Sequence, residues 1–486
     1  MADNKKVIII GAGIAGLCAG VYLKKANFEV EILEAHYMAG GLCMAWKRGD
    51  YIFDTCIHWL VGSKSGTNFH KMWQEVMDID SLQFINSEIF TQVEDEAGGK
   101  LFIYRDVNKF EAELLAKAPE DAAEVKKLTA GIRKFSKLDF PMPGDSRWVT
   151  FKKIIGMAPM LLDFKKATSI TCGAYSKNFK NPLLVKFLNG FFKDMSLLGL
   201  NMSLAWMSNG DAGYPLGGSL VLINKILENY QSLGGKIRYG ARVEKILVEG
   251  DKAAGVRLIN GEEFKADYVV SAADGYSTIY KMLDGKFLDE KIERPYKGWK
   301  TFSSYLQVSL GVAREFPQEK GTLALYLKNK IKVDDKTELN EISARFFNFD
   351  PSMAPVGKTA ITTFLPTDNC EYWVNLRDND RPKYDQEKKR LADEVINIFE
   401  NRYPGFKSAV EVIDVSSPAS IVRYTSNWRG SMEGWLITPQ SGFLTLPQPK
   451  LNNFCMVGQW VMPGGGLPSG LMTAREASIK IVKLFA

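Results

Sequence analysis

The chain opens on a run of aliphatic residues at positions 7–10, followed by glycines and then by apolar positions at helical spacing. A strand that is covered on both faces is aliphatic throughout, so residues 7–10 predict a buried strand of a parallel sheet. Apolar residues at helical spacing predict a helix over residues 14–25. Residues 28–33 alternate and then become aliphatic, which predicts a second strand. This order indicates a βαβ unit.

Three glycines join the first strand to the helix with the spacing Gly11-x-Gly13-x-x-Gly16. Gly11 permits a tight turn, Gly13 lets a pyrophosphate approach the backbone, and Gly16 lets the helix pack close to the sheet. The N-terminus of the helix then presents free N–H groups to the phosphates. Glu34 ends the second strand, near the spacing at which an acidic residue binds a ribose hydroxyl. The pattern predicts a dinucleotide site; the alternative is an ordinary βαβ unit with a surface glutamate.

A second pair of glycines, Gly40 and Gly41, follows the acidic end of the second strand. It suits an extended dinucleotide whose phosphates and ribitol pass a second backbone segment; the alternative is a plain turn. A glycine-rich turn at residues 459–470 lies between a predicted strand at 453–458 and a predicted helix at 471–484. Two glycine-to-helix phosphate sites, far apart in the chain, are therefore expected to build one binding site.

The segments between these glycines predict an inserted α+β unit. Its strands and helices are expected at residues 82–92, 100–104, 108–135, 303–312, 322–327, 342–348, 359–365 and 385–402. A return to the nucleotide-binding unit begins at residue 214, where Ser219 could cap a helix to residue 233. An Asn-Gly pair at residues 260–261 predicts a hairpin of strands 254–259 and 263–270.

The segment 152–166 is the most surface-active part of the chain, because lysine pairs bracket a mostly apolar sequence. It is too short to span a bilayer but long enough to lie in its interface. The alternative is a helical lid over an apolar pocket. Both interpretations imply a lipophilic ligand, and residues 187–207 continue the apolar character.

Composition excludes some classes of function. The net charge is +6 and the lysines and arginines are scattered, so nucleic acid is not indicated, although a weak preference for anionic membranes stays open. Six cysteines lie far apart without a CxxC pair, and three histidines offer no zinc spacing. We expect free thiols, no metal, and a cytoplasmic protein that is soluble or peripheral at the inner face of a membrane.

The chain resembles flavin-dependent oxidoreductases of the phytoene desaturase, carotenoid isomerase and retinol saturase group. The matching segments, in the family's order, are the opening βαβ unit with Glu34, the Gly40-Gly41 pair, residues 49–54, residues 214–219, Val243, and residues 457–470. The resemblance covers essentially the whole chain. Residues 53–62 are most similar to the retinol saturase branch, and residues 463–468 are more similar to the phytoene desaturase branch.

The resemblance implies a mixed α/β and α+β fold with a bound FAD and a lipophilic polyene or isoprenoid substrate. A Rossmann-like FAD-binding domain of the glutathione-reductase-like type 2 would comprise residues 1–80, 208–292 and 430–486. A substrate domain of a mixed sheet plus helices would comprise residues 81–207 and 293–429, and its apolar helices at about 150–205 could contact a membrane. The oligomeric state is not predicted.

The resemblance also implies which residues contact the FAD. The expected contacts to its ADP half, adenine, pyrophosphate, ribitol and ring are Gly11, Gly13, Ala15, Gly16, Glu34, Ala35, Gly40, Gly41, Leu42, Val243, Gly458, Gln459 and Leu467. Many relatives carry an arginine directly after the glycine pair, where this chain has Leu42. Lys47 or Arg48 could replace that charged phosphate contact; backbone N–H groups supply the rest.

Three reactions are open for such an enzyme: desaturation, saturation, and cis–trans isomerisation without net redox change. Hydride transfer with a flavin needs an acid or base only if a proton moves as well. His58 is the candidate for that role, and the alternative is a satisfied core histidine. Asp54 could orient the backbone or His58.

Two other classes of protein fit parts of the pattern. The first is a flavin-free, prenyl-binding escort protein of the Rab GDP-dissociation-inhibitor type, against which Glu34 and the later glycines argue. The second is a flavin amine oxidase, which the apolar residues at 157–164 and 187–207 disfavour because they suit a lipid better than a polar amine.

Overall fold

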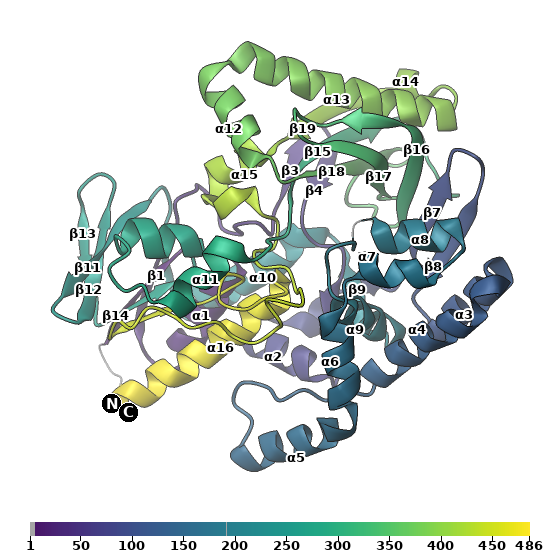
Figure 1. The fold of residues 1–486 in the computed structure, drawn as a ribbon. Helices are drawn as coiled ribbons and strands as arrows, with labels where there is room; N and C mark the ends of the chain where they lie inside the picture. The colour runs from purple at the N-terminus through teal and green to yellow at the C-terminus, as the bar shows by residue number, and fades with distance from the viewer. Residues whose placement is uncertain (1–4, 191) are drawn as a thin grey trace.

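Two large sheets organise the chain in the computed structural model, which describes residues 5–190 and 192–486 (Figure 1). The first sheet has five parallel strands in the order β10-β2-β1-β14-β20. Their bounds are Lys6–Ile10 for β1, Glu29–Leu33 for β2, Lys236–Arg238 for β10, Tyr268–Ser271 for β14 and Phe454–Met456 for β20.

Both faces of this parallel sheet are covered, which explains its aliphatic strands. Val7 and Ile9 belong to a core with α1 (Ile14–Lys25), α10 (Gly218–Ser232) and α16 (Gly466–Phe485). Ile8 and Ile10 face a second core, formed with a small antiparallel sheet. The strands of that sheet are β11 (Val243–Glu249), β12 (Lys252–Leu258) and β13 (Glu263–Lys265).

The second large sheet has seven strands in the order β19-β15-β18-β17-β16-β7-β8. All neighbours are antiparallel except β16 and β7. One face packs on α12 (Cys370–Asn379) and α13 (Arg381–Arg402), which lie above it in Figure 1. The strands are β7 (Ile89–Asp95), β8 (Lys100–Tyr104), β15 (Ser304–Val312), β16 (Thr322–Lys332), β17 (Glu338–Phe346), β18 (Thr359–Thr367) and β19 (Val410–Ser416).

A helical layer packs beside the seven-stranded sheet and has its own apolar core. In Figure 1 α5 projects from the lower edge of the molecule, away from both sheets. The longer helices are α3 (Val107–Lys117), α4 (Ala122–Phe135), α5 (Arg147–Met157), α6 (Leu161–Ser169), α8 (Pro182–Asn189) and α9 (Leu197–Ser208). None of the helices in the described residues is long and apolar enough to cross a membrane.

Short elements connect the two sheets. One of them is an antiparallel hairpin of β3 (Ala45–Arg48) and β4 (Tyr51–Asp54), which follows the glycine pair. Further short elements are β5 (Leu60–Val61), α2 (Asn68–Val76), β6 (Phe84–Ile85), β9 (Ala212–Pro215), α11 (Glu290–Gly298) and α15 (Pro418–Thr425). All six cysteines are free thiols.

Ser219 does not cap its helix as predicted. Helix α10 begins two residues earlier than this cap implies, at Gly218, and its N-cap is Gly217, which has a left-handed φ of 92°. Ser219 therefore lies inside the first turn, where its N–H and hydroxyl donate to the two carboxylate oxygens of Asp54 at 2.6 and 2.7 Å. The carboxylate of Asp54, from a different segment of the chain, therefore satisfies one of the free N–H groups of this helix end.

Two other boundaries differ from the prediction. Helix α16 begins at Gly466 rather than at residue 471, because the last residues of the glycine-rich turn already belong to the helix. The expected strand 263–270 is two strands: β13 ends at Lys265 in the small sheet, and β14 begins at Tyr268 in the parallel sheet. The domain bounds at residues 80, 207, 292 and 429 stay a prediction.

Candidate active site

A cavity of about 850 Å³ extends from the carboxyl ends of the parallel strands to the inner face of the seven-stranded sheet. Ile10 and Leu33 end strands of the first sheet at the cavity, whereas Thr322 and Ser343 belong to the second. The carboxyl edge of an open parallel sheet is where such folds bind ligands. One continuous space therefore joins a nucleotide-type site to the second sheet.

The predicted cofactor contacts come together on this cavity, although they are distant in sequence. Those that line it are Gly11, Gly13, Ala15, Glu34, Ala35, Gly40, Gly41, Leu42, Val243, Gly458, Gln459 and Leu467. Gly16 lies behind them, where a Cβ would be 2.0 Å from the carbonyl oxygen of Gly11. It shapes the turn without facing the cavity, and the roles of these residues stay a prediction.

Two backbone segments form the floor of the nucleotide end. The N–H of Gly40 donates to the carbonyl of Ala12 at 2.9 Å, and Gly13 and Gly40 form an isolated parallel bridge. A Cβ on Gly41 would stand 3.3 Å from the Cα of Gly13. Only residues without side chains let the two segments approach this closely while leaving the cavity open.

Two helix N-termini open on this floor without any side-chain cap. They are those of α1, after Gly13, and of α16, after Gly465. Uncapped N–H groups and the positive end of the helix dipole bind anions, and phosphates above all. The residues present therefore fit the diphosphate of a dinucleotide.

Glu34 stands at the edge of the same floor and is buried. Its carboxylate accepts the N–H of Ala12 at 2.7 Å and the N–H of His36 at 2.8 Å. Burial raises the pKa of Glu34, and these two hydrogen bonds oppose that rise. Each carboxylate oxygen can accept a further bond, so the group both fixes the glycine turn and can receive a ribose hydroxyl.

The expected charged phosphate contact is not made by Lys47 or Arg48. Arg48 Nε contacts Asp414 at 2.8 Å, and Lys47 Nζ contacts Asp50 at 3.8 Å. Neither of these two side chains lines the cavity. Their prediction as phosphate ligands is wrong, because the hairpin β3–β4 turns both side chains outward. Among the described residues that line the cavity, Arg242 is the only lysine or arginine. It contacts the Ser426 hydroxyl.

His58 lines the cavity near the seven-stranded sheet, beside the rings of Trp59 and Phe364 at centroid distances of 6.1 and 5.6 Å. Burial and the neighbouring Arg345 cation lower the pKa of His58 to about 3. Arg345 donates to the backbone carbonyls of Ile57 and His58 at 2.8 and 3.2 Å. Asp54 holds Ser219 instead of His58. His58 is therefore a neutral ring on a fixed backbone.

Replacing His58 with phenylalanine should leave the pH profile of turnover unchanged between pH 5 and pH 9, because the native ring is already uncharged there. General acid–base catalysis contributes about 10²–10⁴-fold to turnover. If H58F lowers turnover by less than about tenfold, His58 therefore has a packing role. The measurement is steady-state turnover of H58F across this pH range at equal flavin content. Loss of a pH limb present in the native enzyme would restore His58 as the proton carrier.

Glu433 also lines the cavity, and the sequence patterns did not single it out. Burial raises its pKa to about 7. No salt bridge or hydrogen bond to its carboxylate is formed by the described residues. Its backbone carbonyl sits against the glycine-rich turn, since a Cβ on Gly465 would be 1.9 Å from that oxygen. An unpaired carboxyl of this pKa can carry a proton at neutral pH.

The rest of the cavity wall is apolar. It is built by the helical layer and by the loop before β20, with Phe140, Met142, Ile154, Met157, Phe187, Met195, Met202, Trp206, Phe443 and Leu444. Rings continue this wall towards the sheet, where Trp59 meets Phe90 edge to face at 5.5 Å. The cavity therefore has a polar, glycine-built end and a long apolar arm.

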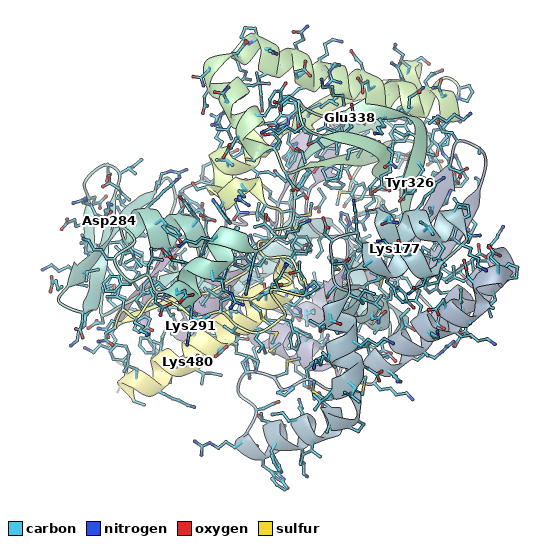
Figure 2. All side chains as sticks on the ribbon, viewed as in Figure 1. Lys177, Asp284, Lys291, Tyr326, Glu338 and Lys480 are labelled. Atoms are coloured by element: carbon cyan, nitrogen blue, oxygen red, sulfur yellow. The ribbon has the colours of Figure 1, made fainter. Side chains whose placement is uncertain are left out.

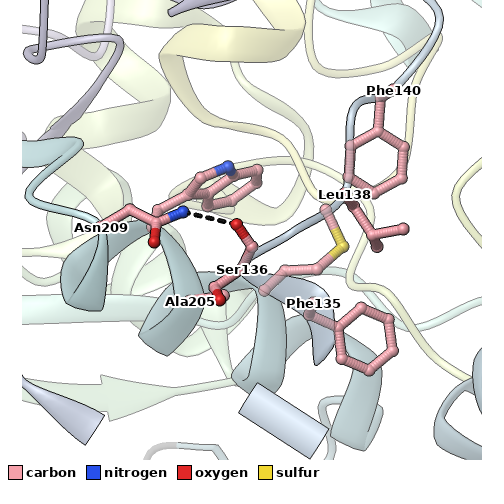
Figure 3. A pocket seen from close by; sticks show the side chains of 8 residues that line it. Phe135, Ser136, Leu138, Phe140, Ala205 and Asn209 are labelled. Carbon is pink, nitrogen blue, oxygen red and sulfur yellow. Dashed lines mark hydrogen bonds between the residues drawn. The ribbon is translucent and has the colours of Figure 1, made fainter. Parts of the chain in front are cut away.

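A second, smaller pocket of about 30 Å³ lies beside the apolar arm (Figure 3). Phe140, Met202 and Trp206 line both spaces. Asn209 Nδ2 donates to the carbonyl of Ser136 at 2.7 Å, as Figure 3 shows. This bond ties the segment that follows α4 to the end of α9, and so fixes one wall of the arm.

Residues 14–482 match the family described as flavin containing amine oxidoreductase. The match covers nearly the whole chain, and the chain belongs to this family. The predictions of a FAD cofactor and of a flavin-dependent oxidoreductase are confirmed.

Particular relatives are more distant. The chain is 25% identical to a chloroplastic prolycopene isomerase of Daucus carota, over 97% of this chain and 79% of that protein. It is 22% identical to a lycopene-forming phytoene desaturase of Pseudescherichia vulneris, over 99% of each. An oxidoreductase structure from Methanosarcina mazei matches with a TM-score of 0.61 and 18% identity, over 97% of this chain and 100% of that one. The last similarity shows the fold alone, and it confirms the predicted fold class.

Proposed function

We propose that this flavoenzyme acts on carbon–carbon bonds of a lipophilic polyene or isoprenoid. The observation that carries the proposal is the single cavity with a dinucleotide floor at one end and an apolar arm at the other. The similarity to a prolycopene isomerase and to a phytoene desaturase supports the same class of substrate. Desaturation, saturation and isomerisation remain the three candidate reactions.

The residues on the cavity floor would hold the FAD. The N–H groups at the start of α1 would bind the diphosphate, which would pass Gly41 and Leu42. Glu34 would bind a ribose hydroxyl, and Val243 and Arg242 would contact the adenosine end. Gly458, Gln459 and Leu467 would lie against the ring system. When bound, FAD supplies hydride transfer, and the protein supplies orientation and a dry pocket.

Glu433 would hold the proton that accompanies this chemistry. It is half-buried and faces the cavity beside the glycine-rich turn, where Gln459 and Leu467 also lie. The pKa of Cys56 is raised mainly by its contact with Cys43 and that of Tyr305 mainly by burial, and the charge of Glu433 adds to both, which places both groups near its carboxylate. The apolar surroundings favour the uncharged carboxyl, which can donate a proton, while its ionised form can accept one.

The two rival classes of protein lack comparable support. An escort protein without flavin would not need two glycine-built backbone segments and two uncapped helix ends on one cavity floor. An amine oxidase needs a path for a polar cation, whereas phenylalanine, methionine and tryptophan side chains dominate the arm. A cation entering that arm would lose its hydration.

The proposed function is tested by anaerobic incubation of the FAD-loaded enzyme with candidate polyenes, followed by mass analysis. Loss of two hydrogens indicates desaturation, gain of two indicates saturation, and an unchanged mass with an altered absorption spectrum indicates isomerisation. Quantitative recovery of every unaltered polyene, together with turnover of a primary amine, would overturn the proposal.

We also propose that α5 and the segment to α6 rest on a membrane surface. Trp148, Phe151, Ile155 and Leu162 are all more than half exposed, at 62%, 53%, 55% and 82%. Lys152 Nζ lies 5.1 Å from the centre of the Trp148 ring. Aromatic and aliphatic side chains next to lysines suit the headgroup region of an anionic bilayer. Ile154 and Met157 of the same helix line the cavity, so this surface adjoins the route of a lipid substrate.

Replacing Trp148, Phe151 and Leu162 together with serine should weaken binding to anionic vesicles by about tenfold or more, because the apolar contact area is lost. The measurement is vesicle co-sedimentation at low and high salt. Val356, which is fully exposed at a different place, supplies the matched control as Val356→Ser. Equal sedimentation of the triple variant and the native protein would favour the lid interpretation.

A further inference from the structure

The inner face of the seven-stranded sheet forms the far end of the cavity. Successive residues of a strand point to opposite faces, so alternate residues of neighbouring strands share the cavity face. On β16 these are Thr322, Ala324 and Tyr326, and on β17 they are Glu341 and Ser343. Their partners in between, such as Leu323 and Ile342, pack into the core under α13.

Three of these residues bring polar groups to one place at this end. Tyr326 stands directly opposite Glu341 in the ladder, and Ala324 stands opposite Ser343. The Tyr326 hydroxyl hydrogen-bonds the Glu341 carboxyl and donates its proton to the carbonyl of Lys186.

Burial favours the uncharged form of the Glu341 carboxyl. No lysine or arginine of the described residues forms an ion pair with it; the nearby Lys186 Nζ contacts Asp95 at 2.8 Å. Burial raises the pKa of Glu341, and the contact with Tyr326 only partly opposes this. A neutral carboxyl both donates and accepts hydrogen bonds. It is therefore matched to a neutral polar group rather than to a cation.

Gly190 shows that the pair is tightly enclosed on its outer side. A Cβ on Gly190 would lie 2.6 Å from the Tyr326 hydroxyl oxygen, and 2.7 and 2.9 Å from the two carboxylate oxygens of Glu341. Backbone therefore covers the pair there, and the remaining open side is the cavity, which Tyr326, Glu341 and Ser343 all line. The carboxyl is therefore placed to hydrogen-bond a group that enters the cavity.

The position along the strand fits the end of a long ligand. Arg345, which holds the His58 backbone, is four residues further along β17, and four residues of a strand span about 13 Å. Between these points the cavity wall is formed by side chains such as Phe90 and Phe364. A ligand that reaches from the flavin end to Glu341 is apolar along its length and meets polar groups at its tip.

We propose that Glu341, Tyr326 and Ser343 form a polar subsite that binds a hydroxyl group at one end of the polyene or isoprenoid substrate. This inference rests on the proposed function, because it specifies the substrate of the same cavity. A hydrocarbon end would leave the half-buried carboxyl without its partner, and sites built to bind a hydroxyl reject ligands that lack it.

The test compares a hydroxylated polyene with the hydrocarbon of the same length, each bound to the FAD-loaded protein and followed by quenching of tryptophan fluorescence. The native protein should bind the alcohol at least about tenfold more tightly. Glu341→Leu should abolish this preference without weakening the binding of the hydrocarbon. Glu341→Gln should retain most of the preference, because an amide also donates and accepts hydrogen bonds.

The same strand offers a matched control. Glu338 lies on β17 but is exposed, and Figure 2 shows it apart from Tyr326. Glu338→Gln should change neither affinity. Flavin content and thermal unfolding verify the fold of each variant, and Ser343→Ala supplies a milder second change that should reduce the preference several-fold.

The outcomes separate the two levels of the proposal. Equal affinity of the native protein for the alcohol and the hydrocarbon, or an unchanged preference in E341L, overturns the polar subsite and leaves the proposed function standing. Tighter binding of a long-chain amine than of the alcohol overturns the assignment of a neutral hydroxyl. Failure to bind either polyene overturns the proposed function itself.

Discussion

Replacing Glu433 with glutamine should lower turnover by about 10²-fold or more while the flavin stays bound. The reason is that a positioned proton carrier contributes about 10²–10⁴-fold, and glutamine preserves the shape but cannot transfer a proton. Glu433 meets the geometric requirement because it faces the cavity beside the glycine-rich turn. Exposed Glu263, on β13, supplies the control as Glu263→Gln.

The pH dependence of the same variant makes the assignment specific. Because burial raises the pKa of Glu433 to about 7, the native enzyme should show an inflexion near pH 7 in kcat/KM, and E433Q should lack it. If the carboxyl donates, activity is present below pH 7 and is lost as the pH rises; if it accepts, the limb is reversed. A native profile without this inflexion, or E433Q with native turnover, would remove Glu433 from the chemistry.

Folding stability should report the same group independently of turnover. The folded pKa is raised from 4.5 to about 7, so the folded state binds the proton more tightly than the unfolded state. The contribution of Glu433 to the free energy of unfolding is therefore fully present below pH 4.5 and is lost as the pH rises through about 7. Denaturant titrations of E433Q should lack this part of the pH dependence.

Gly16→Ala should abolish retention of FAD and lower the free energy of unfolding. The added Cβ would lie 2.0 Å from the carbonyl oxygen of Gly11 and 3.3 Å from Cβ of Ala272. The first contact is with backbone, so α1 must move away from the strand that it follows. Overpacking a core costs about 1–3 kcal/mol, and here the displaced element carries the N–H groups for the diphosphate.

The measurements are flavin absorbance per chain after gel filtration and a denaturant titration. Gly156 supplies the matched control, because it also lies in a helix but has nothing within 4 Å of the position of an added Cβ. Gly156→Ala should retain both flavin and stability. A full complement of FAD in G16A would show that the close packing of α1 is not required for binding.

The sequence predicted the nucleotide end well, because its determinants are local. The bounds of α1 follow from Gly13 before it and from the end of its apolar spacing at Lys25. Strands β1 and β2 are short aliphatic runs between clear turns. Glycine spacing, strand order and Glu34 are all readable within the first forty residues, and together they predict a dinucleotide.

Other features depend on contacts between distant segments and carry no local signal. Arg242 and Glu433 reach the cavity only because β11 and the loop before β20 pack against the carboxyl edge of the parallel sheet. Arg48 turns away because Asp414, on a strand of the other sheet, receives it. The cap of α10 similarly comes from Asp54 rather than from the adjacent Ser219.

The two ends of the cavity also differ in how they could be foreseen. Tyr326 and Glu341 stand opposite each other because of the register of β16 and β17. In the sequence, each is a single polar residue with no motif around it. The apolar segments at 152–166 and 187–207 indicated a lipophilic ligand, but the polar subsite that would meet its end required the sheet.

A crystal structure of the FAD-loaded enzyme with a bound polyene alcohol tests the central claim most directly. We expect the diphosphate at the N-terminus of α1, the polyene along the apolar arm, and its hydroxyl within hydrogen-bonding distance of Glu341. Electron density that places the flavin away from Gly13 and Gly41, or the polyene outside the cavity, would contradict it.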